Sequence, residues 1–246
     1  MNCLQTFVLM LSVLWLSADA ESSNIKNIKL KRTLLGHGFH RDLITRLTLP
    51  PGITASLSKP QCTLLLIETL PSGVYADPYQ LNSLKLFGGS QVLFDSPVNV
   101  ENAEFLSRSH ELYIFVNVSD HFTKDSTNHT EIDVSFPIHA RYHKPSPDKT
   151  HAIVTILHPS LYSNCSESDV TSSITAPCDL SNTSICDWVP LTYLSTSAPL
   201  TLYVPVGQES HKPIVILVTL LVSITVSALL VKVMWISQTA KHDKHS

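Results

Sequence analysis

The sequence lacks the patterns that mark the chemistry of an enzyme. Its 246 residues contain no Gly-x-Ser-x-Gly motif, no glycine-rich phosphate loop and no Asp-x-Asp pair. These absences remove sequence support for a serine hydrolase, a phosphate-binding loop and a divalent-metal site. Twelve histidines are present, but two of the most closely spaced, His139 and His143, would stand about 13 Å apart on a strand. We therefore expect no catalytic residue, no cofactor and no metal site.

The chain is also poor in charge and in glycine. Charged residues make up 15% of the sequence, the net charge is −3, and there are only 7 glycines. No basic surface for nucleic acid is indicated, and nothing suggests a disordered or low-complexity chain. This composition favours a folded domain with a sizeable core.

The longest hydrophobic segment lies near the C-terminus. Residues 214–231 carry no charge, and after Lys232 the apolar run resumes to Ile236. About 20 apolar residues in a helix cross the hydrocarbon core of a bilayer, so residues 213–236 are predicted to span a membrane. The alternative is a helix buried in a protein core.

A second hydrophobic segment, residues 7–16, is too short to span a membrane. It ends at Ala18-Asp19-Ala20, which resembles the small-residue cleavage site of a secretory signal peptide. We therefore predict a signal peptide at residues 1–20, a lumenal domain at 21–212, the span at 213–236 and a cytosolic tail at 237–246. Lys241 and Lys244 behind the span favour this type I orientation.

Cysteine usage agrees with an oxidising compartment. Cys3 would leave with the signal peptide, and an even number of cysteines then predicts two disulfides with three possible pairings. A short local loop favours Cys178–Cys186, which leaves Cys62–Cys165. A zinc site is the competing interpretation, but no Cys-x-x-Cys pair occurs.

Four Asn-x-Ser/Thr sequons lie between the signal peptide and the span. They suit a lumenal glycoprotein whose glycans stand on the surface. The predicted sites are Asn117, Asn128, Asn164 and Asn182.

The region before the span is predicted to be mostly β. Short apolar runs bounded by Pro, Gly, Asn or Ser indicate strands at 43–49, 62–70, 112–118, 131–137, 151–157 and 200–204. In one of them Ile132, Val134 and Phe136 alternate with polar residues. Strand after strand with turns between them predicts a β-sandwich-like domain.

Two local features complete this prediction. A short helix is expected after Asp77, which would be its N-cap, with Pro78 at the first helical position and Leu81 and Leu84 facing inward. Residues 163–197 are rich in Ser, Thr and Cys, and we expect them to form a loop-rich region tied by a disulfide.

Three polar and aromatic clusters resemble a known family. Residues 38–43 read GFHRDL, residues 73–81 read GVYADPYQL, and residues 136–145 read FPIHARYHKP. In this order, and with a type I span, they resemble PIG-X, the non-catalytic subunit of GPI mannosyltransferase I, over about residues 38–207. The residues that could either contact a partner or fix the domain are His40, Arg41, Asp42, Asp77, Tyr79, His139, Arg141, Tyr142 and His143.

The resemblance implies a function that the residues alone do not reveal. Members of this family support PIG-M, a polytopic enzyme of the endoplasmic reticulum membrane that transfers the first mannose to the GPI-anchor precursor. The resemblance therefore implies an accessory, stabilising subunit without catalytic residues of its own, in contact with PIG-M and membrane lipid.

The predicted span offers one contact surface. Thr219, Ser223 and Ser227 recur every four residues, so they line one helix face as small residues that permit close helix approach. The hypothesis is that this stripe packs against a PIG-M helix. The alternative is that Ser and Thr are simply tolerated in the span.

Two other functional classes remain open on the sequence. A single-pass adhesion or receptor ectodomain would also carry a sandwich, disulfides and glycans, although the Cys…Trp…Cys spacing of an immunoglobulin domain is absent. A lumenal enzyme is disfavoured because no nucleophile or metal constellation is found.

Overall fold

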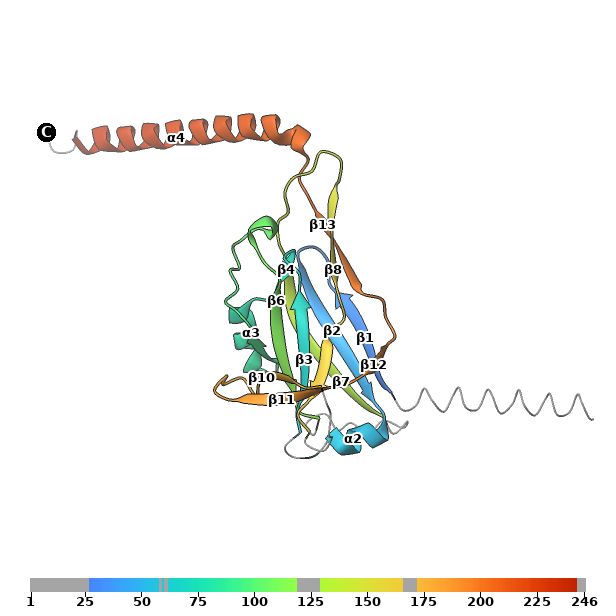
Figure 1. Cartoon of the computed structure of the whole chain (residues 1–246). Coiled ribbons are helices and arrows are strands. Elements are labelled where there is room, and N and C mark those ends of the chain that lie inside the picture. The colour runs from blue at the N-terminus through green and yellow to red at the C-terminus, as the bar shows by residue number, and fades with distance from the viewer. Residues whose placement is uncertain (1–26, 58, 60–61, 119–128, 166–171, 243–246) are drawn as a thin grey trace, which may run out of the picture. The chain divides into compact units, whose positions relative to one another are not determined.

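The computed structural model describes residues 27–57, 59, 62–118, 129–165 and 172–242 (Figure 1). The predicted signal peptide and the sequon at Asn128 lie outside these residues. The chain divides into two compact units, one of Met1–His143 with Ile153–Val204 and one of Lys144–Ala152 with Pro205–Ser246.

The first unit contains a five-stranded sheet in the order β12-β1-β2-β7-β4. The long strands β1, β2 and β7 pair antiparallel, and β12 joins β1 in parallel. Inward residues alternate with exposed ones along β7, as the sequence predicted for Ile132, Val134 and Phe136. The strands are β1 (Ile28–Leu35), β2 (His40–Leu49), β4 (Val74–Tyr75), β7 (Thr130–Ala140) and β12 (Tyr193–Ser195).

A second sheet has six strands in the order β10-β11-β9-β3-β6-β5. Its centre is β3, which pairs antiparallel with both β6 and β9. The strands are β3 (Leu64–Leu70), β5 (Gln91–Phe94), β6 (His110–Val116), β9 (Ser160–Ser163), β10 (Ile174–Pro177) and β11 (Ile185–Pro190).

The two sheets share one hydrophobic core. Leu30 and Leu43 from the first sheet are in the same buried cluster as Leu66 and Ile114 from the second. The pair β8 (His151–Ile156) and β13 (Leu200–Pro205) adds Val154, Ile156, Leu202 and Val204 to this cluster. The mostly β, sandwich-like prediction is confirmed.

Strand β3 is buried on both faces, which fits its nearly continuous apolar sequence. Leu64 and Leu66 belong to the main core, whereas Leu65 packs in a second cluster with Phe115 and Trp188. The hairpin of β10 and β11 supplies Trp188 and covers this outer face. Residues 163–197, which were expected to be loop-rich, contain three short strands: β10 and β11 bury Ala176 and Trp188 against the second sheet, and β12 pairs with β1 of the first.

All six predicted strands occur, and the helix after Asp77 is α3 (Pro78–Lys85). The Asp77 carboxylate accepts hydrogen bonds from the backbone N–H groups of Tyr79 and Gln80, so it is the predicted N-cap. Leu81 is buried, but the inward placement of Leu84 is wrong, since this side chain is 38% exposed. Leu84 lies in the last turn of α3, against the backbone of Gly89 in the turn that ends the helix. A second short helix, α2 (Pro51–Leu57), and a 3-10 turn at Glu104–Leu106 were not predicted.

Two disulfides join the pairs that the sequence favoured. Cys62 and Cys165 lie just outside the paired strands β3 and β9, with their Cα atoms 4.8 Å apart. Cys178 and Cys186 close the β10–β11 hairpin, with their Cα atoms 5.0 Å apart. The first bridge spans 103 residues of sequence and the second only 8.

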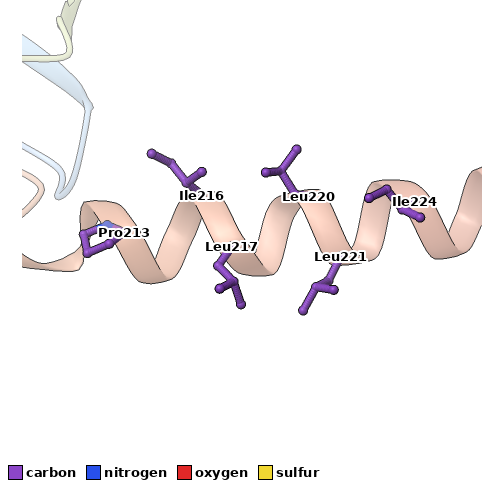
Figure 2. A pocket seen from close by; sticks show the side chains of 6 residues that line it. All are labelled: Pro213, Ile216, Leu217, Leu220, Leu221 and Ile224. Carbon is purple, nitrogen blue, oxygen red and sulfur yellow. The ribbon is translucent and has the colours of Figure 1, made fainter.

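The second unit contains the C-terminal helix α4 (Lys212–His242), preceded by a 3-10 turn at Glu209–His211. Residues Glu209–Ile236 are long and apolar enough to cross a membrane. Ile216, Leu220 and Ile224 point to one side of the helix and Leu217 and Leu221 to another (Figure 2). The Thr225 hydroxyl donates to backbone carbonyls one turn earlier, which satisfies it within the helix itself.

Candidate interaction site

The three polar and aromatic clusters of the sequence meet at one end of the first sheet. His40 at the start of β2 is paired with His139 near the end of β7, and Tyr75 of β4 is paired with the same residue from the other side. The helix α3 follows β4 directly and brings Gln80 to this point. Strand pairing thus brings together His40 and Tyr75, which are 35 residues apart, and Tyr75 and His139, which are 64 apart, and short-range sequence patterns do not reveal this.

His139 is the centre of this arrangement. Its Nε2 atom lies 2.8 Å from Gln80 Oε1, its ring stacks on Tyr75 at 5.1 Å, and it meets the His40 ring edge-on at 4.7 Å. Burial lowers the pKa of His139, and the nearby His40 lowers it further. A neutral, packed and hydrogen-bonded imidazole holds the ends of three strands together.

Arg141 is 4% exposed and lies just beyond the end of β7. Its Nη1 atom donates to the backbone carbonyls of Asn99, at 2.8 Å, and Asn102, at 2.6 Å. Its guanidinium also sits 4.4 Å from the centroid of the Tyr75 ring, a cation–π contact. Arg141 therefore fastens the segment around residues 99–102 to the sheet.

Val154 and His143 leave room only for glycine at position 73. The Nδ1 atom of His143 lies 2.9 Å from the backbone carbonyl of Arg141. A Cβ atom at Gly73 would stand 2.6 Å from Val154 Cγ2 and 3.1 Å from His143 Nε2, so no larger residue fits there without displacement. His143 is thus a packing residue in this region.

Arg41 and Asp42 point to different surroundings, as expected for neighbours on a strand. Arg41 donates to the backbone carbonyls of Gly36 and Gly38 in the turn between β1 and β2, where both glycines have positive φ. Asp42 is exposed. Arg41 therefore stabilises a hairpin turn.

The exposed members of the clusters are the ones available to a partner. Tyr79 is 78% exposed and Tyr142 is 74% exposed, and Tyr142 packs its ring 5.0 Å from Phe39. Tyrosine is favoured at interface hot spots because it offers a large, stiff, amphipathic surface. These two side chains and exposed His40 form the surface part of the site.

Within the residues that the structure describes, no group of three or more His, Cys, Asp or Glu side chains lies close enough to hold a metal ion. The histidines of the clusters are held by other contacts: His40 and His139 by each other's rings and His143 by a backbone carbonyl. These contacts are internal packing contacts of the domain.

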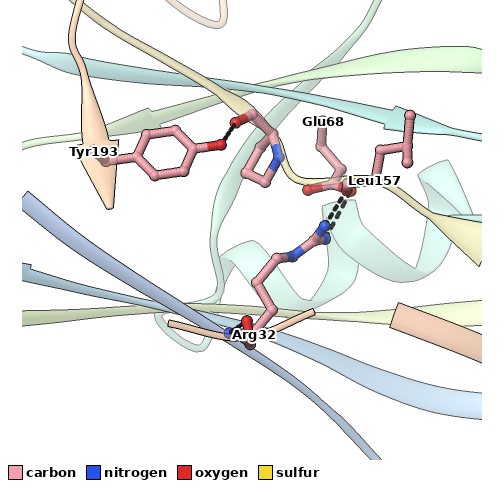
Figure 3. A network of polar contacts seen from close by, with 6 residues as sticks. Arg32, Glu68, Leu157 and Tyr193 are labelled. Atoms are coloured by element: carbon pink, nitrogen blue, oxygen red, sulfur yellow. Dashed lines mark hydrogen bonds and ion pairs between the residues drawn. The ribbon is translucent and has the colours of Figure 1, made fainter. Parts of the chain in front are cut away.

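The sequence missed a buried ion pair between the two sheets. Arg32 of β1 and Glu68 of β3 are fully buried, and Arg32 Nη2 lies 2.7 Å from Glu68 Oε1 (Figure 3). The Arg32 guanidinium also donates to the backbone carbonyl of Leu157, and the Arg32 backbone N–H donates to the Ser197 hydroxyl oxygen at 2.9 Å. Burial raises the pKa of Glu68 to about 7, against the opposing effect of the Arg32 charge.

A signal for this pair was present in the sequence. Arg32 follows Ile28 and Leu30 at every second position of β1, so it occupies the inward face of an alternating strand. Glu68 stands in an otherwise apolar β3. A charged residue in a buried register predicts a buried partner of opposite sign.

Three of the four sequons lie in the described chain. Asn117 and Asn182 are exposed, and Asn182 has a positive φ of 52°, as a turn residue. Asn164 is half-buried, and its side-chain oxygen accepts a 2.7 Å hydrogen bond from the Thr63 backbone N–H.

The fold and the site define a β-sandwich protein with one described helix suited to a membrane, and many of its clustered polar residues are engaged in packing contacts. The PIG-X / PBN1 family model matches residues 36–235, so the chain belongs to this family.

Curated relatives agree with this membership over most of their length. The chain is 31% identical over 210 residues to a Homo sapiens protein, covering 82% of this chain and 78% of the relative. It is 28% identical over 220 residues to a Rattus norvegicus protein, covering 87% and 84%. Each is named "GPI alpha-1,4-mannosyltransferase I, stabilizing subunit".

A solved structure, the major pilin subunit BcpA of Bacillus cereus, is similar only at a TM-score of 0.29 and 12% identity. The matched region covers 73% of this chain and 39% of the pilin.

Proposed function

We propose that this chain is the accessory, stabilising subunit of the endoplasmic reticulum mannosyltransferase that adds the first mannose to the GPI-anchor precursor. The observation that carries the proposal is the match to relatives named as the stabilizing subunit of that enzyme, across most of both chains. The match of the family model over residues 36–235 supports it further.

In this proposal the chain contacts PIG-M, the polytopic subunit that performs the transfer, and is not itself catalytic. The packing contacts of His139, His143 and Arg141 support a structural or recognition role for the residues that could otherwise perform chemistry. Exposed Tyr79 and Tyr142 are the side chains of the lumenal domain that we propose for the contact.

The proposed topology is type I in the endoplasmic reticulum membrane. The signal peptide at 1–20 is removed, residues 21–212 lie in the lumen, residues 213–236 cross the membrane and residues 237–246 face the cytosol. Two disulfides and exposed sequons at Asn117 and Asn182 support a lumenal domain. The adhesion or receptor alternative is not favoured by relatives named as a mannosyltransferase subunit.

The test is restoration of GPI-anchored proteins at the surface of cells that lack PIG-X. We expect expression of the full chain to restore them, measured by flow cytometry of a GPI-anchored reporter. Residence in the endoplasmic reticulum is checked in the same cells by the endoglycosidase H sensitivity of the chain's glycans. No restoration by a chain that is expressed and retained there would contradict the proposal.

The membrane helix provides a second proposed contact with PIG-M. Replacing Thr219, Ser223 and Ser227 with leucine fills the small-residue face and prevents close helix approach. We expect the amount of PIG-M that co-purifies with the chain to fall several-fold, because interhelical hydrogen bonds of such residues in membranes contribute roughly 0.6 kcal/mol each on average and the close packing is lost as well.

A matched control lies one residue back on the same helix. Replacing Val218, Val222 and Val226 with leucine adds bulk to a neighbouring face and keeps the helix apolar. This variant should co-purify like the unaltered chain. Equal recovery of PIG-M with both triple variants would show that the stripe is not the docking face.

A further inference from the structure

A polar pocket of about 310 Å³ lies beside Arg141 and is not used by the proposed function. It is lined by Arg108, His110 and Arg141 together with three serines and two asparagines, and none of its lining residues is acidic. A volume near the lower end of the range for small-molecule sites leaves room for about ten waters or one compact polar ligand.

Two of the basic side chains in this pocket are buried and incompletely hydrogen-bonded. Arg141 is 4% exposed, its Nε atom has no hydrogen-bond partner, and it forms no ion pair with any described carboxylate. His110 is 5% exposed and its Nε2 atom has no partner either. A buried guanidinium without a counter-ion is costly, since neutral carbonyls and one aromatic ring do not cancel its charge.

The surroundings of His110 hold its ring in place. A hydrogen bond with the backbone of Arg108 orients it, and the Phe94 ring stacks beside it at 6.4 Å. Burial lowers the pKa of His110, and the nearby Arg141 charge lowers it further. The nearest acidic group acting on it is Asp95, whose carboxylate is already engaged by the Glu111 backbone N–H and the Ser96 hydroxyl.

We propose that this pocket binds a phosphate-type oxyanion that carries hydroxyl groups, such as a polyol phosphate. Arg141 supplies the buried charge and Arg108, which is exposed, supplies a second charge at the opening. The seryl hydroxyls and asparagine amides are suited to the hydroxyl groups of the same ligand. The inference rests on the pocket and does not depend on the chain being a transferase subunit.

The test is a binding titration of the purified full chain in detergent by calorimetry. The probes are inorganic phosphate, glycerol 3-phosphate and, as the neutral counterpart, glycerol. We expect both phosphates to bind, glycerol 3-phosphate more tightly, and glycerol not to bind. Absence of binding by either phosphate at about 10 mM overturns the proposal.

Variants locate the binding site. Arg108→Gln should weaken phosphate binding at least about threefold, and Arg141→Gln at least about tenfold, because each removes a charge-assisted hydrogen bond. Arg46→Gln removes the same charge from an exposed ion pair on β2 and should leave binding unchanged. If Arg141→Gln does not fold, judged by the fluorescence of buried Trp188, the exposed Arg108 variant alone decides. Equal binding by the Arg108 and Arg46 variants overturns the proposal.

Lipid vesicles distinguish the source of the phosphate. Full chain in phosphatidylcholine nanodiscs is compared with nanodiscs containing phosphatidylinositol, with glycerol 3-phosphate as competitor. If glycerol 3-phosphate no longer binds to the chain in the phosphatidylinositol discs, the lipid headgroup occupies the site. If its binding is the same in both kinds of disc, the site takes a soluble phosphate. If no phosphate binds but Arg108→Glu releases PIG-M, the pocket takes an acidic side chain of the partner and the phosphate proposal is wrong.

Discussion

Replacing both Cys62 and Cys165 with serine should lower the free energy of unfolding by about 4–5 kcal/mol. The bridge closes a sequence separation of 103 residues, and the chain-entropy relation gives about 4.7 kcal/mol for a loop of that length. The bridge also holds together the ends of the paired strands β3 and β9, so its loss frees these two strand ends. Denaturant unfolding of the purified full chain, followed by circular dichroism, measures this loss.

The second disulfide is the matched control, since it involves the same chemical change. It closes a separation of only 8 residues, for which the same relation gives about 2.5 kcal/mol. Serine at Cys178 and Cys186 should therefore cost roughly half as much, with a local change at Trp188, which belongs to this hairpin. An equal or larger loss from the short loop would contradict the argument.

Replacing Arg32 with methionine should destabilise the sandwich by about 3–5 kcal/mol at pH 8. The substitution leaves the Glu68 carboxylate buried between the sheets without its counter-ion, which is the costly way to break such a pair. Replacing both residues, with methionine at Arg32 and leucine at Glu68, should restore stability to within about 1 kcal/mol of the unaltered chain. Denaturant midpoints of the three proteins measure both effects.

The loss at Arg32 should depend on pH in a defined direction. The pKa of Glu68 is raised from 4.5 to about 7 in the folded chain, so its contribution to stability is full below about pH 4.5 and is lost as the pH rises through 7. Without Arg32 that pKa rises further, and the penalty of an ionised Glu68 continues to grow above pH 7. The loss at Arg32 should therefore be larger at pH 8 than at pH 5 by up to about 1.4 kcal/mol, the equivalent of the one pH unit that separates pH 8 from the pKa of Glu68 in the unaltered chain.

An exposed ion pair provides the control for this variant. Arg46 lies 2.6 Å from Asp133, and both side chains are nearly half exposed. Methionine at Arg46 should change stability by less than about 1 kcal/mol, because solvent screens an exposed pair. A loss at Arg46 as large as that at Arg32, or a pH-independent loss at Arg32, would contradict the role assigned to the buried pair.

The sequence predicted those elements whose signal is local. Alternation in β7, the continuous apolar run of β3 and the Asp77-Pro78 start of α3 each reflect a pattern within a few residues. The edge strands β4, β5 and β12 have two to four residues each, too few for a periodic pattern. Their existence depends on pairing with distant strands.

The site was predicted in the same uneven way. The three clusters were recognised, but their contacts arise from the register that pairs His40 with His139 and Tyr75 with His139. The pocket beside Arg141 includes a segment of residues 96–110, where the sequence showed no motif. Arg141 reaches this pocket because β7 ends next to that segment. The contact joins Arg141 and Asn99, which are about 40 positions apart in the sequence.

The lifetime of PIG-M shows directly whether this chain stabilises that enzyme. In cells that lack PIG-X, pulse-chase labelling should show that expression of the full chain lengthens the half-life of PIG-M. A variant that has lost the Cys62–Cys165 bridge should lengthen it less. An unchanged PIG-M half-life, with the chain expressed and retained in the endoplasmic reticulum, would contradict a stabilising subunit.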